Sequence, residues 1–95
     1  MTIKKRNSTI VKELNKIFPA ENPNHPIAFE QDGLVKVSAE NVALETFLYD
    51  GDPMTVSITI ADYYECYMSD ELVKYADSVN GYWEWENAGV MSLAY

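Results

Sequence analysis

The chain has 95 residues, of which 47% are hydrophobic and 23% are charged. This composition is typical of a folded globular protein, and the length allows one modest hydrophobic core, so we treat residues 1–95 as a single domain. No run approaches the roughly 20 apolar residues that cross a bilayer, and polar Asn7, Ser8 and Thr9 stand where a signal peptide would need an apolar core. A lone cysteine, Cys66, excludes an intramolecular disulfide. We expect a cytoplasmic protein that is not bound to a membrane.

The charge is divided unevenly along the chain. Residues 1–16 carry five basic side chains and one acidic one, for a net charge of +4. Residues 17–95 carry only Lys36 and Lys74 against fourteen carboxylates, for a net charge of −12. Such a field repels nucleic acid and membranes and accelerates encounter with basic partners. Solubility alone is the alternative explanation of the acidity.

The first part of the chain predicts one helix and four strands. Apolar residues recur at helical spacing over residues 8–18, with Asn7 or Ser8 as N-cap and Pro19 ending the helix. The proline-rich stretch 19–26 predicts a loop. Strands are expected at residues 27–30, 34–38, 42–49 and 54–60, with turns at 31–33 and 50–53. Residues 54–60 alternate strictly between apolar and polar, which predicts a strand with one buried and one exposed face.

The second part predicts a helical turn, a helix and a hairpin. Asp62 and Glu65 have capping-box spacing, which indicates a short helical turn over residues 63–68. Ser69 can cap a further helix that ends at Asn80-Gly81. Residues 82–86 and 90–95 are then expected to form two strands around a turn at 87–89. The fold class is therefore α+β: an N-terminal helix, a mainly antiparallel sheet of four to six strands, and a second helix before a C-terminal hairpin.

No residue pattern specifies catalysis, a cofactor or a metal site. The only histidine, His25, lies in the proline-rich loop without a sequence neighbour that could act as its nucleophile or orienting acid. Cys66 adjoins Glu65 and no basic residue, so we expect a half-buried structural cysteine. Glu84 and Glu86 would share one environment on a strand, whereas a catalytic acid and base need different ones. Asp50-Gly51-Asp52 resembles the start of a calcium loop but lacks the ligands that should follow.

The strongest candidate for a functional surface is the segment 62–86. Seven carboxylates and seven aromatic side chains share these 25 residues. Tyr and Trp dominate the energetics of protein interfaces, and a carboxylate rim favours a basic partner. The alternative is that these aromatics belong to the core and the acids form a solvated face. The predicted partner-binding residues are Glu65, Asp70, Glu71, Asp77, Tyr82, Trp83, Glu84, Trp85 and Glu86.

A short, acidic, tyrosine-rich α+β chain without catalytic residues resembles the small phage-encoded anti-defence proteins, especially the anti-CRISPR proteins. The resemblance covers size and composition along the whole chain and involves no diagnostic motif. It implies a non-enzymatic inhibitor that binds a basic, nucleic-acid-handling host complex in the host cytoplasm and blocks nucleic-acid access. An immunity or antitoxin protein that neutralises a basic toxin and a small carbohydrate-binding module are the alternatives, and a homodimer stays open. The basic N-terminal helix leaves room for a second contact of opposite charge.

Overall fold

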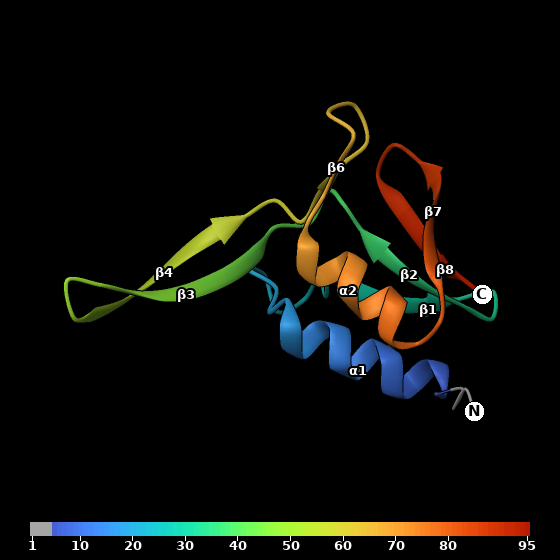
Figure 1. The fold of residues 1–95 in the computed structure, drawn as a ribbon, viewed down its shortest axis with the longest axis horizontal. Helices are drawn as coiled ribbons and strands as arrows, with labels where there is room; N and C mark the ends of the chain where they lie inside the picture. Colours follow the sequence, from blue (N-terminus) through green and yellow to red (C-terminus); the bar gives the residue numbers. More distant parts are fainter. Residues whose placement is uncertain (1–4) are drawn as a thin grey trace.

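A computed structural model describes residues 5–95, and Lys4 of the basic N-terminal segment therefore lies outside the described residues. This part of the chain forms two helices and eight strands, and Figure 1 shows their arrangement. In chain order they are α1 (Asn7–Ile17), β1 (Ala28–Gln31), β2 (Leu34–Ser38), β3 (Ala43–Tyr49), β4 (Asp52–Ile58), β5 (Ala61–Asp62), β6 (Tyr67–Met68), α2 (Asp70–Ser78), β7 (Tyr82–Asn87) and β8 (Val90–Ala94).

The main sheet is antiparallel and has the strand order β1-β2-β8-β7. Helix α1 packs on β1 and β2, and α2 packs on β7, so both helices cover the same face of the sheet (Figure 1). The predicted α+β class is confirmed, including the N-terminal helix and the second helix before the C-terminal hairpin.

The hydrophobic core lies between the helices and the sheet. Periodic apolar residues supply it from both sides, and its fully buried members with the largest side chains are Phe18, Ile10, Leu14, Ile27, Ile60, Leu72, Met91, Leu93 and Val37. Ile17 of α1 and Val73 of α2 are apolar but lie outside this core, at 43% and 42% exposed. Tyr75 is buried in α2, because it reaches across to α1.

Helix α1 is held to the edge of the sheet by the side chain of Asn15. Its Nδ2 donates to the Ala28 carbonyl (2.9 Å), and its Oδ1 accepts from the Ala28 amide (2.8 Å). The side chain thereby replaces the neighbouring strand that the edge strand β1 lacks. The N-cap prediction is wrong, because Arg6 is the N-cap and contributes no side-chain bond. The Asn7 side chain instead donates to the Gly33 carbonyl in the β1–β2 turn.

Helix α2 has the ends that its sequence predicts. The Ser69 hydroxyl accepts from the Leu72 amide at the N-terminus. At the C-terminus Asn80 adopts φ +57, and the amides of Asn80 and Gly81 donate to the carbonyls of Asp77 and Ala76. Gly81 is required for packing, since a Cβ there would lie 2.6 Å from the Ala94 carbonyl oxygen.

Two tight turns close hairpins at the predicted positions. Asp32 and Gly33 have φ values of +56 and +78, and Asp50 and Gly51 have +52 and +84. Two consecutive positive φ angles are the type I′ geometry that Asp-Gly favours. The first turn joins β1 to β2, and the second joins β3 to β4.

The hairpin β3–β4, residues 43–58, projects from the body and is called the arm below (Figure 1). It forms its own two-stranded sheet and is anchored at its base by Ala43, which is fully buried. The expectation of one buried face along residues 54–60 is wrong. Met54 is 43% exposed, Val56 and Ile58 are half-buried, and only Ile60 is fully buried, because β4 leaves the core together with β3.

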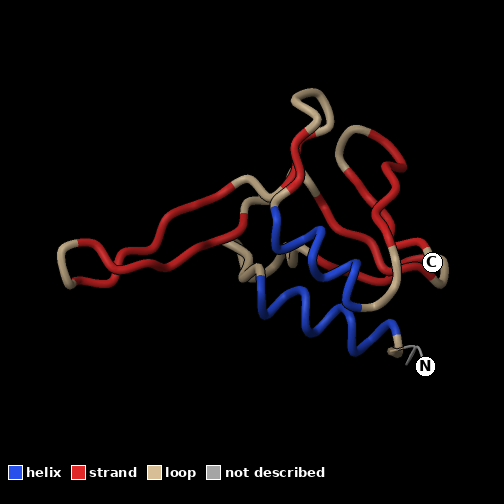
Figure 2. The backbone as a smooth tube through the Cα atoms, viewed as in Figure 1, coloured by secondary structure: helices blue, strands red, loops and turns tan. Residues whose placement is uncertain are grey.

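The predicted helical turn over residues 63–68 is also wrong. These residues belong to a second small hairpin, in which β5 and β6 pair around a turn at 63–66 (Figure 2). The Asp62 carboxylate accepts from the Tyr64 and Glu65 amides, which favours a turn. Cys66 then adopts φ +52, which ends the helical path. Cys66 is exposed, so the expectation of a half-buried cysteine is wrong.

Candidate functional site

The structure distributes the predicted 62–86 surface over three places. Glu65 and Trp85 lie at or beside the small β5–β6 hairpin, and Trp83 turns inward. Acidic residues of α2 occupy a second place: Asp70, Glu71 and Asp77. The face of the main sheet opposite the helices, called the outer face below, holds Tyr82, Glu84 and Glu86. Asp77, Tyr82 and Trp83 nevertheless line one hollow of about 220 Å³ where α2 meets β7.

On the outer face, Glu86 is engaged in an internal ion pair. Its Oε2 lies 3.0 Å from Nζ of Lys36, whose side chain is only 7% exposed. Gln31 accepts a second bond from the same ammonium group. A buried ammonium needs such partners, because an unpaired charge in this position is costly. Glu86 therefore stabilises the sheet, whereas Glu84 and Tyr82 are exposed on the same face.

Trp83 contributes mainly to packing. Its indole Nε1 donates to the Leu72 carbonyl at 2.8 Å, and its ring packs against the core. This contact joins β7 to α2 and explains part of the packing between these two elements. Trp83 therefore fits the alternative that the sequence left open, in which some aromatics of the segment belong to the core.

The first turn of α2 places two carboxylates beside its N-terminus. Asp70 and Glu71 are exposed and follow the Ser69 cap. Negative charge is favourable at this end of the helix dipole. Asp77 is exposed near the opposite end of the helix. These acids are free of the ion pairs described in residues 5–95 and present negative charge to solvent.

The remaining aromatics line an open hollow of about 480 Å³, called the aromatic pocket below. Its walls come from the turn and strand β6 of the β5–β6 hairpin and from β7, and they consist of Tyr63, Tyr64, Cys66, Tyr67, Met68 and Trp85. Tyr63 stands edge-on to Tyr64 at 5.4 Å and to Trp85 at 5.5 Å, with interplanar angles of 89° and 79°. Tyr64 is 80% exposed. The pocket is therefore an exposed aromatic cluster with walls in nearly perpendicular planes.

The arm is a second candidate surface. Its tip carries apolar side chains on both faces: Phe47 and Met54 pair on one face, and Leu48 and Pro53 pair on the other. Leu48 and Tyr49 are 74% and 66% exposed. The arm also carries Glu45, Asp50 and Asp52 and no basic residue. Its surface is thus apolar at the tip and negative in charge.

The two edges of the arm differ. The Leu44 amide points outward from β3 and donates to the Pro19 carbonyl at 2.7 Å. Because outward groups alternate along an antiparallel strand, the backbone groups of Thr46 and Leu48 point to the same side. On β4, Pro53 removes one outward donor, which discourages pairing at that edge. The outer edge of β3 is therefore the better of the two for adding a strand.

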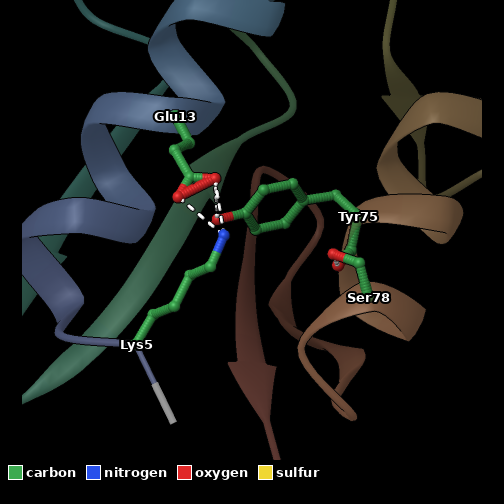
Figure 3. A network of polar contacts seen from close by, with 4 residues as sticks. All are labelled: Lys5, Glu13, Tyr75 and Ser78. Atoms are coloured by element: carbon green, nitrogen blue, oxygen red, sulfur yellow. Dashed lines mark hydrogen bonds and ion pairs between the residues drawn. The ribbon is translucent and has the colours of Figure 1, made fainter. Parts of the chain in front are cut away.

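Lys5, Glu13 and Tyr75 form a polar network that links the two helices (Figure 3). Lys5 Nζ lies 2.8 Å from Glu13 Oε1, and the Tyr75 hydroxyl donates to Glu13 Oε2 at 3.3 Å. Burial, followed by the negative charge of Glu13, raises the pKa of Tyr75 to about 12. Lys5 is thus committed to an internal contact, whereas Arg6, Lys12 and Lys16 are exposed.

Residues 5–95 contain neither a cluster of metal-ligating side chains nor a membrane-spanning helix. No group of three or more His, Cys, Asp or Glu side chains in this range is arranged to hold a metal ion. No helix in the same range is long and apolar enough to cross a membrane. His25 is an exposed loop residue whose amide donates to the Asn22 carbonyl.

Comparisons with known proteins give no match. No protein-family model, no curated protein and no solved structure matches the chain.

Sequence reasoning missed the tip of the arm and the tyrosines of the aromatic pocket. A signal for the tip exists in the run Phe47-Leu48-Tyr49, since three consecutive large apolar residues in a strand cannot all face one core. The predicted segment includes Tyr63, Tyr64 and Tyr67, but their common pocket depends on the β5–β6 hairpin. The capping-box spacing of Asp62 and Glu65 predicted a helical turn there instead.

Proposed function

We propose that this protein is a stoichiometric inhibitor that binds a basic, nucleic-acid-handling protein and blocks its access to nucleic acid. The arm is the observation that carries the proposal. It presents Leu48, Tyr49, Phe47 and Met54 to solvent on a two-stranded ribbon. Apolar clusters of this kind mark interaction sites, and an isolated ribbon is only marginally stable in water. A partner that covers the tip would remove its apolar side chains from water and would stabilise the two-stranded ribbon.

The charge of the arm and of the body indicates the chemistry of that partner. Residues 17–95 have a net charge of −12, and the arm adds only carboxylates to its apolar tip. A basic groove that normally holds nucleic acid is complementary to such a surface. In this proposal the tip of the arm supplies apolar contact area, and the exposed acids of α2 and the outer face occupy positions of phosphates.

A pull-down followed by competition tests the proposal. The tagged protein is used to capture binding partners from a cell lysate. The lysate comes from the cells in which the protein is expressed or from the cells in which it acts. We expect a captured protein that binds nucleic acid and releases it when the inhibitor is added at a 1:1 ratio. Recovery of no nucleic-acid-binding protein, or capture without displacement of nucleic acid, contradicts the proposal.

Two sets of variants separate the arm from the acidic surface. Leu48→Ser combined with Tyr49→Ser removes apolar area at the tip, and we expect at least a tenfold loss of affinity, equivalent to about 1.4 kcal/mol. Leu34→Ser is the control, because Leu34 is likewise an exposed leucine, at 42%, but lies in the β1–β2 hairpin.

Charge reversal at Asp70, Glu71 and Glu84 should slow association and weaken its salt dependence. Glu86 is left unchanged because it is paired with Lys36. Inhibition that persists unchanged in both sets of variants would overturn the proposed surface.

A further inference from the structure

The aromatic pocket leaves three tyrosine rings of one small hairpin exposed to solvent. Three tyrosines occur within five residues, and Tyr63, Tyr64 and Tyr67 are 48%, 80% and 45% exposed. Burial of these rings would contribute to stability, yet the chain leaves them at the surface. Nothing described in residues 5–95 fills the hollow of about 480 Å³ that they surround.

The geometry of the rings suits a cation. Tyr63 is nearly perpendicular to both Tyr64 and Trp85, so the walls of the pocket do not stack into one flat platform. An aromatic ring is negative on its face, and a cation near several such faces is attracted by each of them. Flat platforms suit sugar rings, whereas walls at right angles can contact both the face and the edge of a planar charged group.

The charge around the pocket has the matching sign. The hairpin, residues 61–68, carries Asp62 and Glu65 and no basic residue. Asp62 is used to hold the turn through the Tyr64 and Glu65 amides, whereas Glu65 is exposed beside the pocket. Among the described residues, those that line the pocket include no basic side chain.

The pocket is also preorganised. Trp85 is fixed in β7 opposite Met91, and Met68 is fixed in β6 opposite Ala61. The turn that carries Tyr63 and Tyr64 is closed by Asp62 and by the left-handed conformation of Cys66. A site that is already formed loses little conformational entropy when its ligand binds.

We propose that the aromatic pocket binds the guanidinium group of an arginine side chain of the protein partner. A planar, weakly hydrated guanidinium can lie against one ring while its edge meets another, and it can pair with a nearby carboxylate such as Glu65. Arginine is also enriched at the centres of protein interfaces. This inference rests on the proposed function for the source of the arginine, but the chemistry of the pocket can be tested without the partner.

The test compares two small probes that differ in charge and hardly in shape. N-acetyl-arginine amide and N-acetyl-citrulline amide are titrated into the full chain while the aromatic NMR resonances are recorded. We expect the arginine probe to shift the resonances of Tyr63, Tyr64 and Trp85 with millimolar affinity. Citrulline should bind about tenfold more weakly, because it lacks the positive charge. Added salt should weaken binding of arginine only.

Variants localise the effect to the pocket. Tyr64→Leu should reduce arginine binding about fivefold or more without changing the melting temperature, because Tyr64 is 80% exposed. Tyr82→Leu is the matched control, since Tyr82 is 54% exposed but lies on the outer face of the sheet. We expect it to bind the probe as the unaltered protein does.

Several outcomes overturn the inference. Equal binding of arginine and citrulline would identify an apolar pocket without cation selectivity. A shift produced by maltose and not by arginine would identify a sugar site, and the absence of any shift would exclude all three ligands. Failure of the pull-down together with selective arginine binding would refute the proposed function and leave the pocket intact. Inhibition that depends on the arm, without any binding of arginine in the pocket, would support the proposed function and refute the arginine site.

Discussion

Removing the side chain of Asn15 should destabilise the fold far more than its place on a surface helix suggests. The amide of Asn15 donates to the Ala28 carbonyl and accepts from the Ala28 amide, at 2.9 and 2.8 Å. Ala28 is only 1% exposed, so Asn15→Ala leaves two poorly hydrated backbone groups without partners. Each such group costs about 1 to 3 kcal/mol. Alanine recovers about 0.6 kcal/mol through its higher helix propensity. We expect a net loss of about 1.4 kcal/mol or more.

Urea denaturation followed by circular dichroism measures this loss. With a slope of about 1 to 2 kcal/mol per molar urea, the midpoint should fall by about 1 M or more. Lys12→Ala changes an exposed residue of the same helix and should alter stability by less than about 0.5 kcal/mol. Asn15→Asp preserves the volume and one acceptor but sets an oxygen against the Ala28 carbonyl, so it should also destabilise. A loss below about 0.5 kcal/mol for Asn15→Ala would refute the reasoning, because water would then be satisfying both groups.

Three further predictions concern charge, ionisation and backbone conformation. Glu86→Gln should lower the free energy of unfolding by about 1 to 3 kcal/mol, because the buried Lys36 ammonium loses the carboxylate that pairs with it. Adding Lys36→Met should restore most of this loss in urea melts. An unchanged urea midpoint for Glu86→Gln would contradict the prediction. The pKa of Tyr75 is raised to about 12, whereas an unfolded tyrosine ionises near pH 10. Its contribution is therefore fully present below pH 10 and is lost as the pH rises to about 12, and Tyr75→Phe should flatten this part of the stability profile. Cys66 adopts φ +52, a conformation that glycine tolerates better than other residues. Cys66→Gly should therefore raise the free energy of unfolding by about 0.5 to 1 kcal/mol, whereas Cys66→Ala should not. Equal stability of the two variants would exclude backbone strain at this position.

Much of the fold could be predicted because the signals are local. Asp-Gly pairs adopt consecutive positive φ angles at low cost, and both hairpin turns occur where the sequence places them. The cap of α2 at Ser69 and its end at Asn80-Gly81 depend only on a few neighbouring backbone groups. The wrong prediction at residues 63–68 also rests on a local signal, because a carboxylate that can cap a helix can equally accept hydrogen bonds within a turn.

The location of the candidate surfaces could not be predicted, because it depends on which strands share a sheet. The alternation over residues 54–60 is equally compatible with a strand in a sheet against a core and with a ribbon that leaves it. Likewise, Glu84 and Glu86 look equivalent in sequence. The register of β2, β8 and β7 places Glu84 in line with Lys36 through Ser92, yet the ion pair forms with Glu86, which lies at the register shift between Trp85 and Asn87.

The sequence by itself determined the charge division, the α+β class and the positions of most turns, because composition and local backbone preferences are properties of short segments. The tertiary structure alone decided that the 62–86 segment is split over three places, that β3–β4 forms an arm, and that Tyr63, Tyr64 and Trp85 surround one pocket. Trp85 and the tyrosines belong to different hairpins, and only long-range packing sets the distance between them.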